Sequence, residues 1–578
     1  MRLTRGGLIT AGAAAVALWV GAAPAPAPAQ QTGFAGSFLA GRAAAAREAL
    51  AAAARFYAAA LARDPDNRAL RDRALTFMLL SGDLRGAAGV AGALARADPD
   101  HRLAALALVA DDFRTAEFDA AADRLSGGAD GMNALVRRLL AGWAEVGRAD
   151  REAMEAAFAV EGGDAMTRIF ASYHLGLARA AMGDLEGAET ALRAAAPDGS
   201  GGRRPTLALA ALLEMTERQA EARELLEGAV GPSRVGRRAQ AELARMARGE
   251  GPSLLVRSAR SGAAETFFSI AGALGAERGA QVALLYARLA TALRPELHEG
   301  HLLIGDLLSS ERRWAEAASA YATVPRRSPL FPEAEIGRAD ALQALERHDE
   351  AIAALERVAE AEPESLRAWL ALASARRRAE RWERAAEAYD RAIALIDPVE
   401  PRHWGVFYER GIAHERAGQW EKAEADFLKA LELEPEQPLV LNYLGYSWVE
   451  LRRNLERAQD MIERAVEQRP EDGYITDSLG WVLYRVGKYE AAVPHLERAV
   501  ELEPTDPIIN DHLGDALWMV GRRLEARFQW KRALSFDPEP EDAERIRAKL
   551  ERGLDAVLRE EAAAEEAASA DAGESEDG

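Results

Sequence analysis

The sequence predicts an all-α chain, an α-solenoid in which pairs of helices stack side by side. Glycines toward the C-terminal end are spaced by 34, 35 and 34 residues, at Gly411, Gly445, Gly480 and Gly514. Prolines keep a similar step, at Pro435, Pro470, Pro504 and Pro538. Composition agrees, because 49% hydrophobic residues, many of them alanine, with 28% charged and only 6% aromatic residues favour helices. A fixed period of this length is typical of repeat proteins that share one continuous core.

Residues 1–29 have the features of a secretory signal peptide. Two arginines precede an apolar run over residues 8–23, and Ala27-Pro28-Ala29 offers the small-x-small pattern of a cleavage site. The run is short for a membrane span. We therefore expect cleavage after Ala29, a periplasmic or secreted location, and no transmembrane segment in the mature chain. An uncleaved anchor, which would keep the chain membrane-associated, is the alternative.

Charge and cysteine content exclude several classes of function. The chain has 72 Lys and Arg against 92 Asp and Glu, a formal net charge of −20, which repels a phosphate backbone. No basic patch is segregated along the sequence, so a nucleic-acid partner is not expected. The chain has no cysteine, which excludes disulfides, thiol catalysis, cysteine zinc sites and lipidation on cysteine.

Each repeat is predicted to form two helices joined by a turn. The unit at residues 473–506 places Leu479, Gly480 and Leu483 on the first helix, Gly487 at the turn, Ala492, Leu496 and Ala499 on the second helix, and Pro504 after its end. The glycine and alanines allow the two helices to approach closely, and the leucines fill the space between and behind them. Proline cannot continue a helix, so it fixes the link to the next unit.

These residues resemble the tetratricopeptide repeat, whose pattern is bulky, Leu, Gly, bulky, then Ala, aromatic, Ala and Pro. The unit at residues 404–437 matches with Phe407, Gly411, Ala423, Phe427, Ala430 and Pro435. Units at residues 298–331 and 366–399 match most of the pattern, and weaker matches extend upstream to residues 34–67. The resemblance implies a right-handed superhelix of roughly 12–14 helix pairs, whose first helices line the concave face.

The repeats suggest a division of the chain into segments. We expect a signal peptide at 1–29, divergent repeats at 30–202, irregular repeats or a joint at 203–263, a C-terminal array at 264–540 that is clearest at 404–540, a capping helix at 541–559, and an acidic disordered tail at 560–578. Glycine- and charge-rich stretches support the joint, with an ordinary long loop as the alternative. The tail has eight acidic and no basic residues from Glu560 onward.

The sequence contains no motif that points to catalysis. We find no nucleophile elbow, phosphate-binding loop or dinucleotide-binding glycine motif. His298 and His301 do not have the spacing of a zinc protease, and no third ligand lies near them in the sequence. Repeats also use almost all of the length. We therefore expect no catalytic residue, no metal and no cofactor.

Function is then expected on the concave surface. The family pattern assigns the second, fifth, sixth, ninth, twelfth and thirteenth positions of each unit to this surface. Ten residues in this register are expected to form a partner-binding groove: Tyr408, Asn442, Tyr446, Asp477, Trp481, Tyr484, Arg485, Asp511, Asp515 and Trp518. The same register contains Tyr443, Tyr474 and Ile508. Aromatic side chains are favoured at binding anchors. The alternative is that some of these rings pack against the neighbouring helix.

Three stretches, "NYLGYSWVE", "DSLGWVLYR" and "NDHLGDALW", also resemble exported tetratricopeptide proteins of Gram-negative bacteria. One such type is a lipoprotein that activates a carboxy-terminal processing protease; this chain lacks the lipid-bearing cysteine. We expect a non-enzymatic scaffold or adaptor in the cell envelope that binds a protein or peptide. An adaptor of a periplasmic processing protease, an accessory enzyme with unrecognised activity, and a spacer with an empty groove are the alternatives. Partner identity and oligomeric state do not follow from the sequence.

Overall fold

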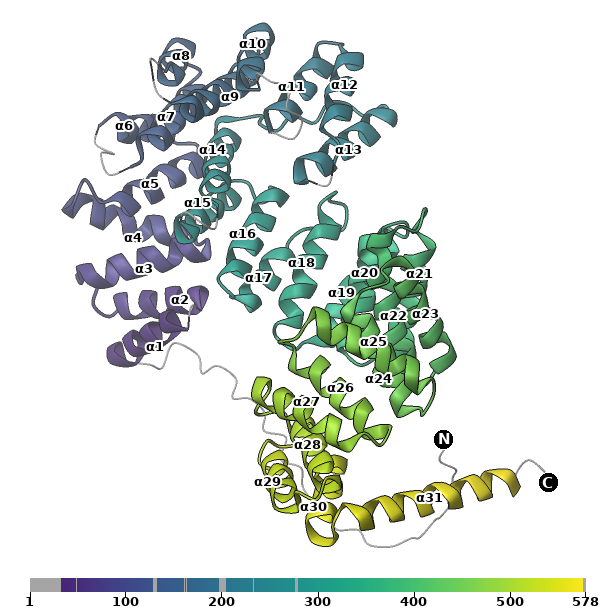
Figure 1. Cartoon of the computed structure of the whole chain (residues 1–578). Coiled ribbons are helices and arrows are strands. Elements are labelled where there is room, and N and C mark those ends of the chain that lie inside the picture. Colours follow the sequence, from purple (N-terminus) through teal and green to yellow (C-terminus); the bar gives the residue numbers. More distant parts are fainter. Residues whose placement is uncertain are drawn as a thin grey trace, which may run out of the picture. The chain divides into compact units, whose positions relative to one another are not determined.

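A computed structural model describes residues 33–574 apart from 48, 128–131, 161, 163, 197–203, 232 and 276–278 (Figure 1). The expected signal peptide, residues 1–29, lies outside this range. All regular elements among the described residues are helices, and successive helices pack in pairs. The prediction of an all-α solenoid of helix pairs is confirmed. The chain divides into two compact units, residues 1–347 and 348–578.

The first unit begins with five helix pairs. Their helices are α1 (Phe34–Ala46), α2 (Leu50–Leu61), α3 (Arg68–Ser81), α4 (Leu84–Ala97), α5 (Arg102–Thr115), α6 (Phe118–Ser126), α7 (Ala134–Arg148), α8 (Arg151–Phe158), α9 (Ala165–Ala181) and α10 (Leu185–Ala195). Six of these helices begin at an Asn or Asp whose side chain accepts a backbone N–H of the first turn: Asn67, Asp83, Asn133, Asp150, Asp164 and Asp184.

The segment predicted to hold irregular repeats or a joint, residues 203–263, is largely helical over its described residues. It contains α11 (Arg204–Met215), α12 (Gln219–Ala229) and α13 (Arg234–Ala247), and it runs into the next pair, α14 (Ala259–Leu274) and α15 (Ala280–Leu293). This pair does not simply extend the row. Helix α14 contacts α5, α7 and α9, and α15 contacts α3 and α5 (Figure 1). The unit ends with α16 (His298–Ser310), α17 (Trp314–Tyr321) and α18 (Phe331–Gln343).

The packing of α14 against α7 and α9 is specific. Gly262 faces the indole of Trp143 so closely that a Cβ atom at this position would collide with it. The hydroxyl of Tyr173 donates to the buried carboxylate of Glu265 at 2.9 Å, and Arg204 pairs with the same carboxylate at 2.6 and 2.8 Å. Since α3, α5, α7 and α9 are first helices of their pairs, the concave face of this part of the array is filled by the chain's own helices.

The second unit is a row of helix pairs. Its helices are α19 (His348–Ala361), α20 (Leu366–Arg378), α21 (Trp382–Ala394), α22 (Trp404–Arg416), α23 (Trp420–Leu433), α24 (Pro438–Glu450), α25 (Leu455–Gln468), α26 (Gly473–Arg485), α27 (Tyr489–Leu502), α28 (Pro507–Met519), α29 (Arg523–Leu534), α30 (Pro540–Arg552) and α31 (Leu554–Glu574), with a short 3-10 turn at Pro401–His403. The boundary between the units, after Arg347, falls inside the segment predicted as one array at 264–540.

The repeated glycines have the role that their spacing suggests. Each of the four lies on a first helix, opposite a large side chain of the second helix of its pair: Gly411 opposite Phe427, Gly445 opposite Ile462, Gly480 opposite Leu496 and Gly514 opposite Trp530. A Cβ atom at any of them would lie within 3.0 Å of that side chain. Glycine is therefore needed at these positions for the helices to pack at this distance.

The C-terminal segment differs from the single capping helix expected at 541–559. Helix α30 ends at Arg552, the chain turns at Gly553 with φ of +82°, and α31 continues to Glu574. The segment expected to be a disordered tail from residue 560 is thus helical as far as Glu574. Alanine and glutamate, which dominate this segment, are strong helix formers.

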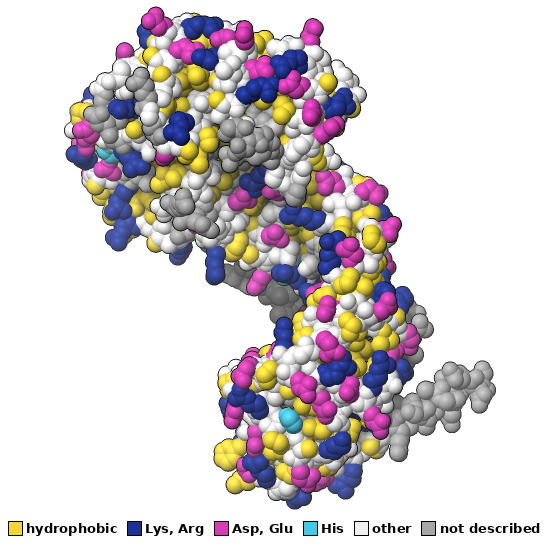
Figure 2. All heavy atoms as spheres, turned by 45° about the horizontal axis from the view of Figure 1, so that its top comes forward, with side chains coloured by type: hydrophobic (Ala, Val, Ile, Leu, Met, Phe, Trp, Pro, Cys, Tyr) yellow, Lys and Arg dark blue, Asp and Glu magenta, His cyan; other side chains and the backbone are white. Residues whose placement is uncertain are grey.

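The surface is mixed in charge. On the face shown in Figure 2, Lys and Arg side chains are interspersed with Asp and Glu in both units, with apolar side chains between them. Among the described residues, no helix combines the length and the apolar character that crossing a bilayer requires.

Candidate functional site

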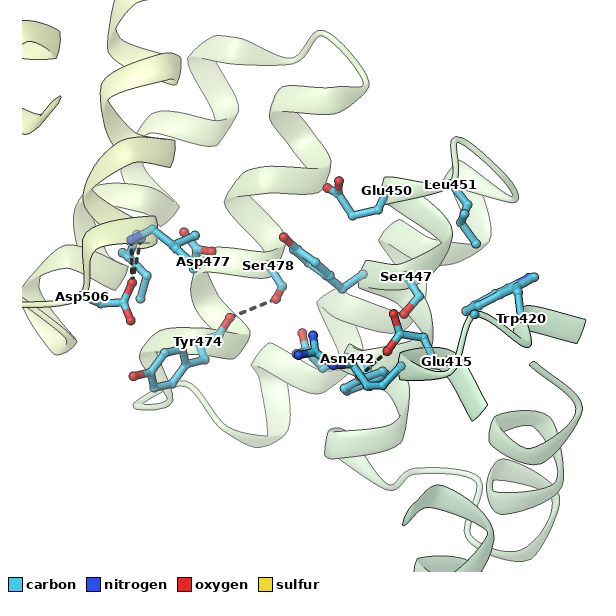
Figure 3. Close-up of a pocket in the computed structure, with 16 residues that line it drawn as sticks. Glu415, Trp420, Asn442, Ser447, Glu450, Leu451, Tyr474, Asp477, Ser478 and Asp506 are labelled. Carbon is cyan, nitrogen blue, oxygen red and sulfur yellow. Dashed lines mark hydrogen bonds between the residues drawn. The ribbon is translucent and has the colours of Figure 1, made fainter. Parts of the chain in front are cut away.

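The second unit has a cavity of about 630 Å³ on the face formed by its first helices (Figure 3). Helix α22 contributes Glu415 and Arg416; α24 contributes Asn442, Tyr443, Tyr446, Ser447 and Glu450; α26 contributes Tyr474, Asp477 and Ser478; α28 contributes Ile508 and Ile509. Gly418 lies in the turn between α22 and α23, and Trp420 is the first residue of α23. Four successive repeats therefore build one cavity. Its volume lies in the range of about 300–1,000 Å³ that is typical of ligand sites.

Exposed apolar side chains surround this cavity. Tyr474 is 56% exposed, Ile508 is 49% exposed and Leu451 is 44% exposed. Side chains of this size are usually buried, so three of them around one hollow provide contact area for a partner. Tyr474 and Ile508 occupy the second position of successive repeats, which is why both face the same hollow.

Two polar atoms in the cavity wall have no hydrogen-bond partner among the described residues. They are the side-chain oxygen of Asn442 and the indole N–H of Trp420. An unpaired buried polar group costs free energy, and a bound segment would supply the missing partner only if these side chains turned toward the cavity. Apolar contact area is therefore the main feature that the cavity offers to a partner.

The ten residues predicted for the groove separate into several environments. Asn442, Tyr446 and Asp477 line the main cavity. Trp481, Arg485 and Asp511 line a second, more polar hollow of about 350 Å³, to which Tyr446 also contributes. The remaining predicted residues line neither hollow: Tyr408, Tyr484, Asp515 and Trp518.

For five of the ten, the prediction of an accessible side chain is wrong. The exposed fractions are 6% for Asp477, 7% for Trp481, 8% for Tyr484, 9% for Asp511 and 0% for Asp515. The alternative, that rings in this register pack against the neighbouring helix, describes Trp481. Its indole stacks on the imidazole of His512, one repeat onward, with centroids 3.9 Å apart, and on Tyr484 at 4.8 Å. Its N–H donates to Glu450 of the preceding repeat at 2.6 Å.

The buried aspartates bind cations of the same chain. The imidazole Nδ1 of His512 lies 2.9 Å from the carboxylate of Asp477. Lys549 of α30 is fully buried, and its ammonium donates to Asp511 at 2.7 Å and to Asp515 at 2.7 Å. The indole of Trp530 donates to Asp515 at 2.9 Å. Asp477 therefore joins α26 to α28, and Asp511 and Asp515 join α28 to α30, which occupies the end of the groove.

This cluster shifts the pKa values of its members. Burial and the neighbouring Asp515 carboxylate raise the pKa of Asp511 to about 6, although Lys549 opposes the shift. Burial alone would lower the pKa of His512, but the carboxylates of Asp477, Asp511 and Asp515 raise it above its ordinary value. Proton binding is thus favoured in the folded cluster.

The other predicted residues are half-buried. Tyr408 packs edge-to-face on Tyr443, and burial raises its pKa to about 12. Arg485 lies over the ring of Trp481 and reaches Glu450 at 3.4 Å. Trp518 covers Gly553 and donates to Asp555 at 3.1 Å. These three side chains hold the repeats together or close the C-terminal end of the array.

Several residues that line the cavity were not among the ten predicted. Tyr443, Tyr474 and Ile508 belong to the predicted register, so the periodic pattern contained the signal that identifies them. Trp420, the first residue of α23, and Leu451 and Asp506, which flank helix ends, lie outside that register, and only the packing of neighbouring pairs brings them to the cavity. No group of three or more His, Asp or Glu side chains among the described residues is arranged to hold a metal ion.

The repeats match known families and relatives. A tetratricopeptide repeat model matches residues 302–357, 336–398, 452–507 and 478–539, and a second model of the same repeat matches residues 404–437. The TPR repeat-containing protein PA4667 of Pseudomonas aeruginosa is 27% identical over 189 residues, which make up 32% of this chain and 31% of that protein. The match therefore spans about a third of that relative's length.

Solved structures of repeat proteins are also similar. A tetratricopeptide repeat protein of Parabacteroides merdae has 16% identity and a TM-score of 0.37, over 43% of this chain and 96% of its own. The APC/C hetero-tetramer Cut9–Hcn1 has 16% identity and a TM-score of 0.35, over 84% of this chain and 96% of its own. The chain therefore contains tetratricopeptide repeats at residues 302–398, 404–437 and 452–539.

Proposed function

We propose that the second unit binds a protein or peptide segment in the cavity between α24, α26 and α28, and that the chain acts as a non-enzymatic scaffold. The observation that carries this proposal is the cavity itself, where Tyr474, Ile508 and Leu451 are exposed around unpaired polar atoms. The corresponding face of α3, α5, α7 and α9 is filled by α14 and α15, so it does not offer an equivalent groove.

A position-specific photocrosslinker tests this proposal. We expect p-benzoylphenylalanine in place of Tyr474 to form adducts with a partner from an extract of the source cells. The same group in place of Phe528, which is 66% exposed on α29, serves as the control for nonspecific capture. Equal adducts at both positions would contradict binding in the cavity, as would adducts that survive the change of Ile508 to Ser.

The cellular location of the protein is the second part of the proposal. The signal-peptide pattern at residues 1–29 supports export to the periplasm or outside the cell. Fusion of residues 1–40 to alkaline phosphatase, which folds only after export, should give active enzyme outside the cytoplasm. The matched fusion that begins at residue 30 should give none.

A narrower candidate is an adaptor of a carboxy-terminal processing protease, supported by the resemblance of residues 442–450, 477–485 and 510–518 to exported repeat proteins. The chain should then raise the rate at which such a protease cleaves a substrate, and Tyr474→Ala should reduce this effect while Phe528→Ala leaves it unchanged. An unchanged cleavage rate on addition of the full chain would exclude the adaptor role and leave the general scaffold proposal in place.

A further inference from the structure

We propose that the cavity of the second unit selects a peptide that carries a Lys or Arg side chain next to bulky apolar residues. This inference rests on the proposed function and adds the chemistry of the partner. Four carboxylates, Glu415, Glu450, Asp477 and Asp506, line the cavity, whereas Arg416 is the one cationic side chain among its lining residues. The exposed apolar side chains around the cavity and the carboxylates that line it together determine which peptide binds.

The carboxylates are not all neutralised within the chain. Asp477 is paired with His512, and Glu450 lies 3.4 Å from the guanidinium of Arg485, so the negative charge of the cavity lies mainly on Glu415 and Asp506. Glu415 accepts a hydrogen bond from the Tyr443 hydroxyl at 3.1 Å, and Asp506 accepts from the backbone N–H groups of Ile508 and Ile509 at 2.9 and 3.0 Å. These donors are uncharged, so they orient the carboxylates and leave the negative charge in place. A cation that enters the cavity is therefore attracted by the negative charges of Glu415 and Asp506.

The arrangement suits an alternation of apolar and cationic side chains. Figure 3 shows Glu415 beside Trp420 at one side of the cavity and Asp506 beside Tyr474 at the other, with Asn442 and Ser478 between them. Glu450, whose side chain is 43% exposed, lies on a third side. A bound segment therefore meets one acidic side chain next to Trp420 and another next to Tyr474, while its backbone lies near the amide of Asn442.

Charge also favours a peptide of another protein, and not a segment of this chain, as the occupant of the cavity. The chain has a formal net charge of −20, and its C-terminal residues from Glu560 onward include eight acidic and no basic side chains. Acidic segments of this kind are repelled by an acidic cavity, whether they come from the same chain or from a second copy. A segment of a different protein that carries both cationic and apolar side chains is complementary to the cavity in charge and in hydrophobicity.

Selection from a phage-displayed library of short random peptides on the full chain tests this inference. We expect the bound pool to be enriched in Lys or Arg beside Phe, Tyr, Trp, Leu or Ile, and its binding to decrease as salt is raised. For one selected peptide, the double variant Glu415→Gln with Asp506→Asn should weaken binding by roughly threefold to tenfold. Both changes keep the hydrogen-bond acceptor and remove the charge. The same variant should leave unchanged the binding of a peptide in which Gln replaces each Lys or Arg.

The controls separate the possible failures. Glu467→Gln, at an exposed position on α25 away from the cavity, should not change the affinity. A pool that needs Tyr474 for binding but is acidic or uncharged would overturn this inference and leave the proposed function intact. A library that gives no Tyr474-dependent peptide would overturn both. A dimer that Tyr474→Ala dissociates would show that a second copy is the occupant and would also overturn the inference.

Discussion

The indole of Trp481 stacks on the imidazole of His512, with ring centroids 3.9 Å apart and ring planes within 12° of each other. The two residues belong to successive repeats, so the stack joins α26 to α28. His512 in turn contacts Asp477 through Nδ1 at 2.9 Å, and Trp481 donates to Glu450 of α24 at 2.6 Å. A side chain in the register expected to face a partner is therefore part of the contact between three repeats.

The first prediction is that Trp481→Ala destabilises the second unit instead of acting only on binding. Trp481 is 7% exposed, and removing a buried indole of this size typically costs about 3–5 kcal/mol. Tyr474→Ala, at a position that is 56% exposed, should change the free energy of unfolding by less than about 0.5 kcal/mol. Chemical denaturation followed by circular dichroism compares the two variants. Equal stability losses would contradict the assignment of one ring to the core and the other to the cavity.

The second prediction concerns pH. The pKa of His512 is raised in the folded state above the ordinary value of about 6.5, so its contribution to stability is complete below that pH and is lost as pH rises through the folded pKa. Asp511, with a folded pKa of about 6, acts in the same direction between its ordinary pKa, about 3.9, and pH 6. The melting temperature should therefore fall more steeply from pH 6 to pH 8.5 in the wild type than in His512→Gln. Parallel pH profiles would show that His512 does not bind its proton more tightly in the folded unit.

The third prediction concerns the buried ammonium of Lys549. Its removal in Lys549→Met leaves the buried Asp511 and Asp515 with only the more distant Arg545 guanidinium, at 3.5 and 3.6 Å, and breaking a buried pair of this kind typically costs about 3–5 kcal/mol. Replacing both aspartates with Asn in the same variant should recover most of this loss, because no uncompensated charge then remains.

Hydrogen exchange should show where the effect of Lys549→Met is concentrated. Because Lys549 joins α30 to α28, amides of α30 and α31 should lose protection before those of α22. Uniform loss of protection across the second unit would indicate that the cluster stabilises the whole array, and not the attachment of its last two helices.

The fourth prediction concerns the closure of the first unit. Gly262→Ala places a Cβ against the indole of Trp143, and overpacking of this kind typically costs about 1–3 kcal/mol. Gly272→Ala on the same helix meets no atom within 4 Å and should stabilise the helix by about 0.5–1 kcal/mol. Adding Trp143→Phe to Gly262→Ala should recover part of the loss, and thermal unfolding of the four chains measures these differences. A neutral Gly262→Ala would mean that α14 does not pack closely on α7.

Much of the fold follows from the sequence because its signal is local. The step of 34 or 35 residues places Gly411, Gly445, Gly480 and Gly514 opposite large side chains within the same helix pair, so a linear pattern is enough to predict each pair. The return of α14 onto α7 and α9 has no such signal. It depends on contacts such as Tyr173 with Glu265, which lie 92 residues apart.

The sequence by itself determined the helix-pair architecture, since the pairs depend on spacing within one repeat, and the resemblance to tetratricopeptide repeats supplied the register expected to face the concave side. Only the tertiary structure decided which side chains of that register are free. Trp481 and Asp477 meet His512 of the next repeat, and Asp515 meets Lys549 of a helix that is not part of the repeat pattern, so their surroundings come from residues 31 to 35 positions away. Tyr474, by contrast, is 56% exposed and lines the cavity. Exposure depends on what packs above a residue, which its position within the repeat does not specify.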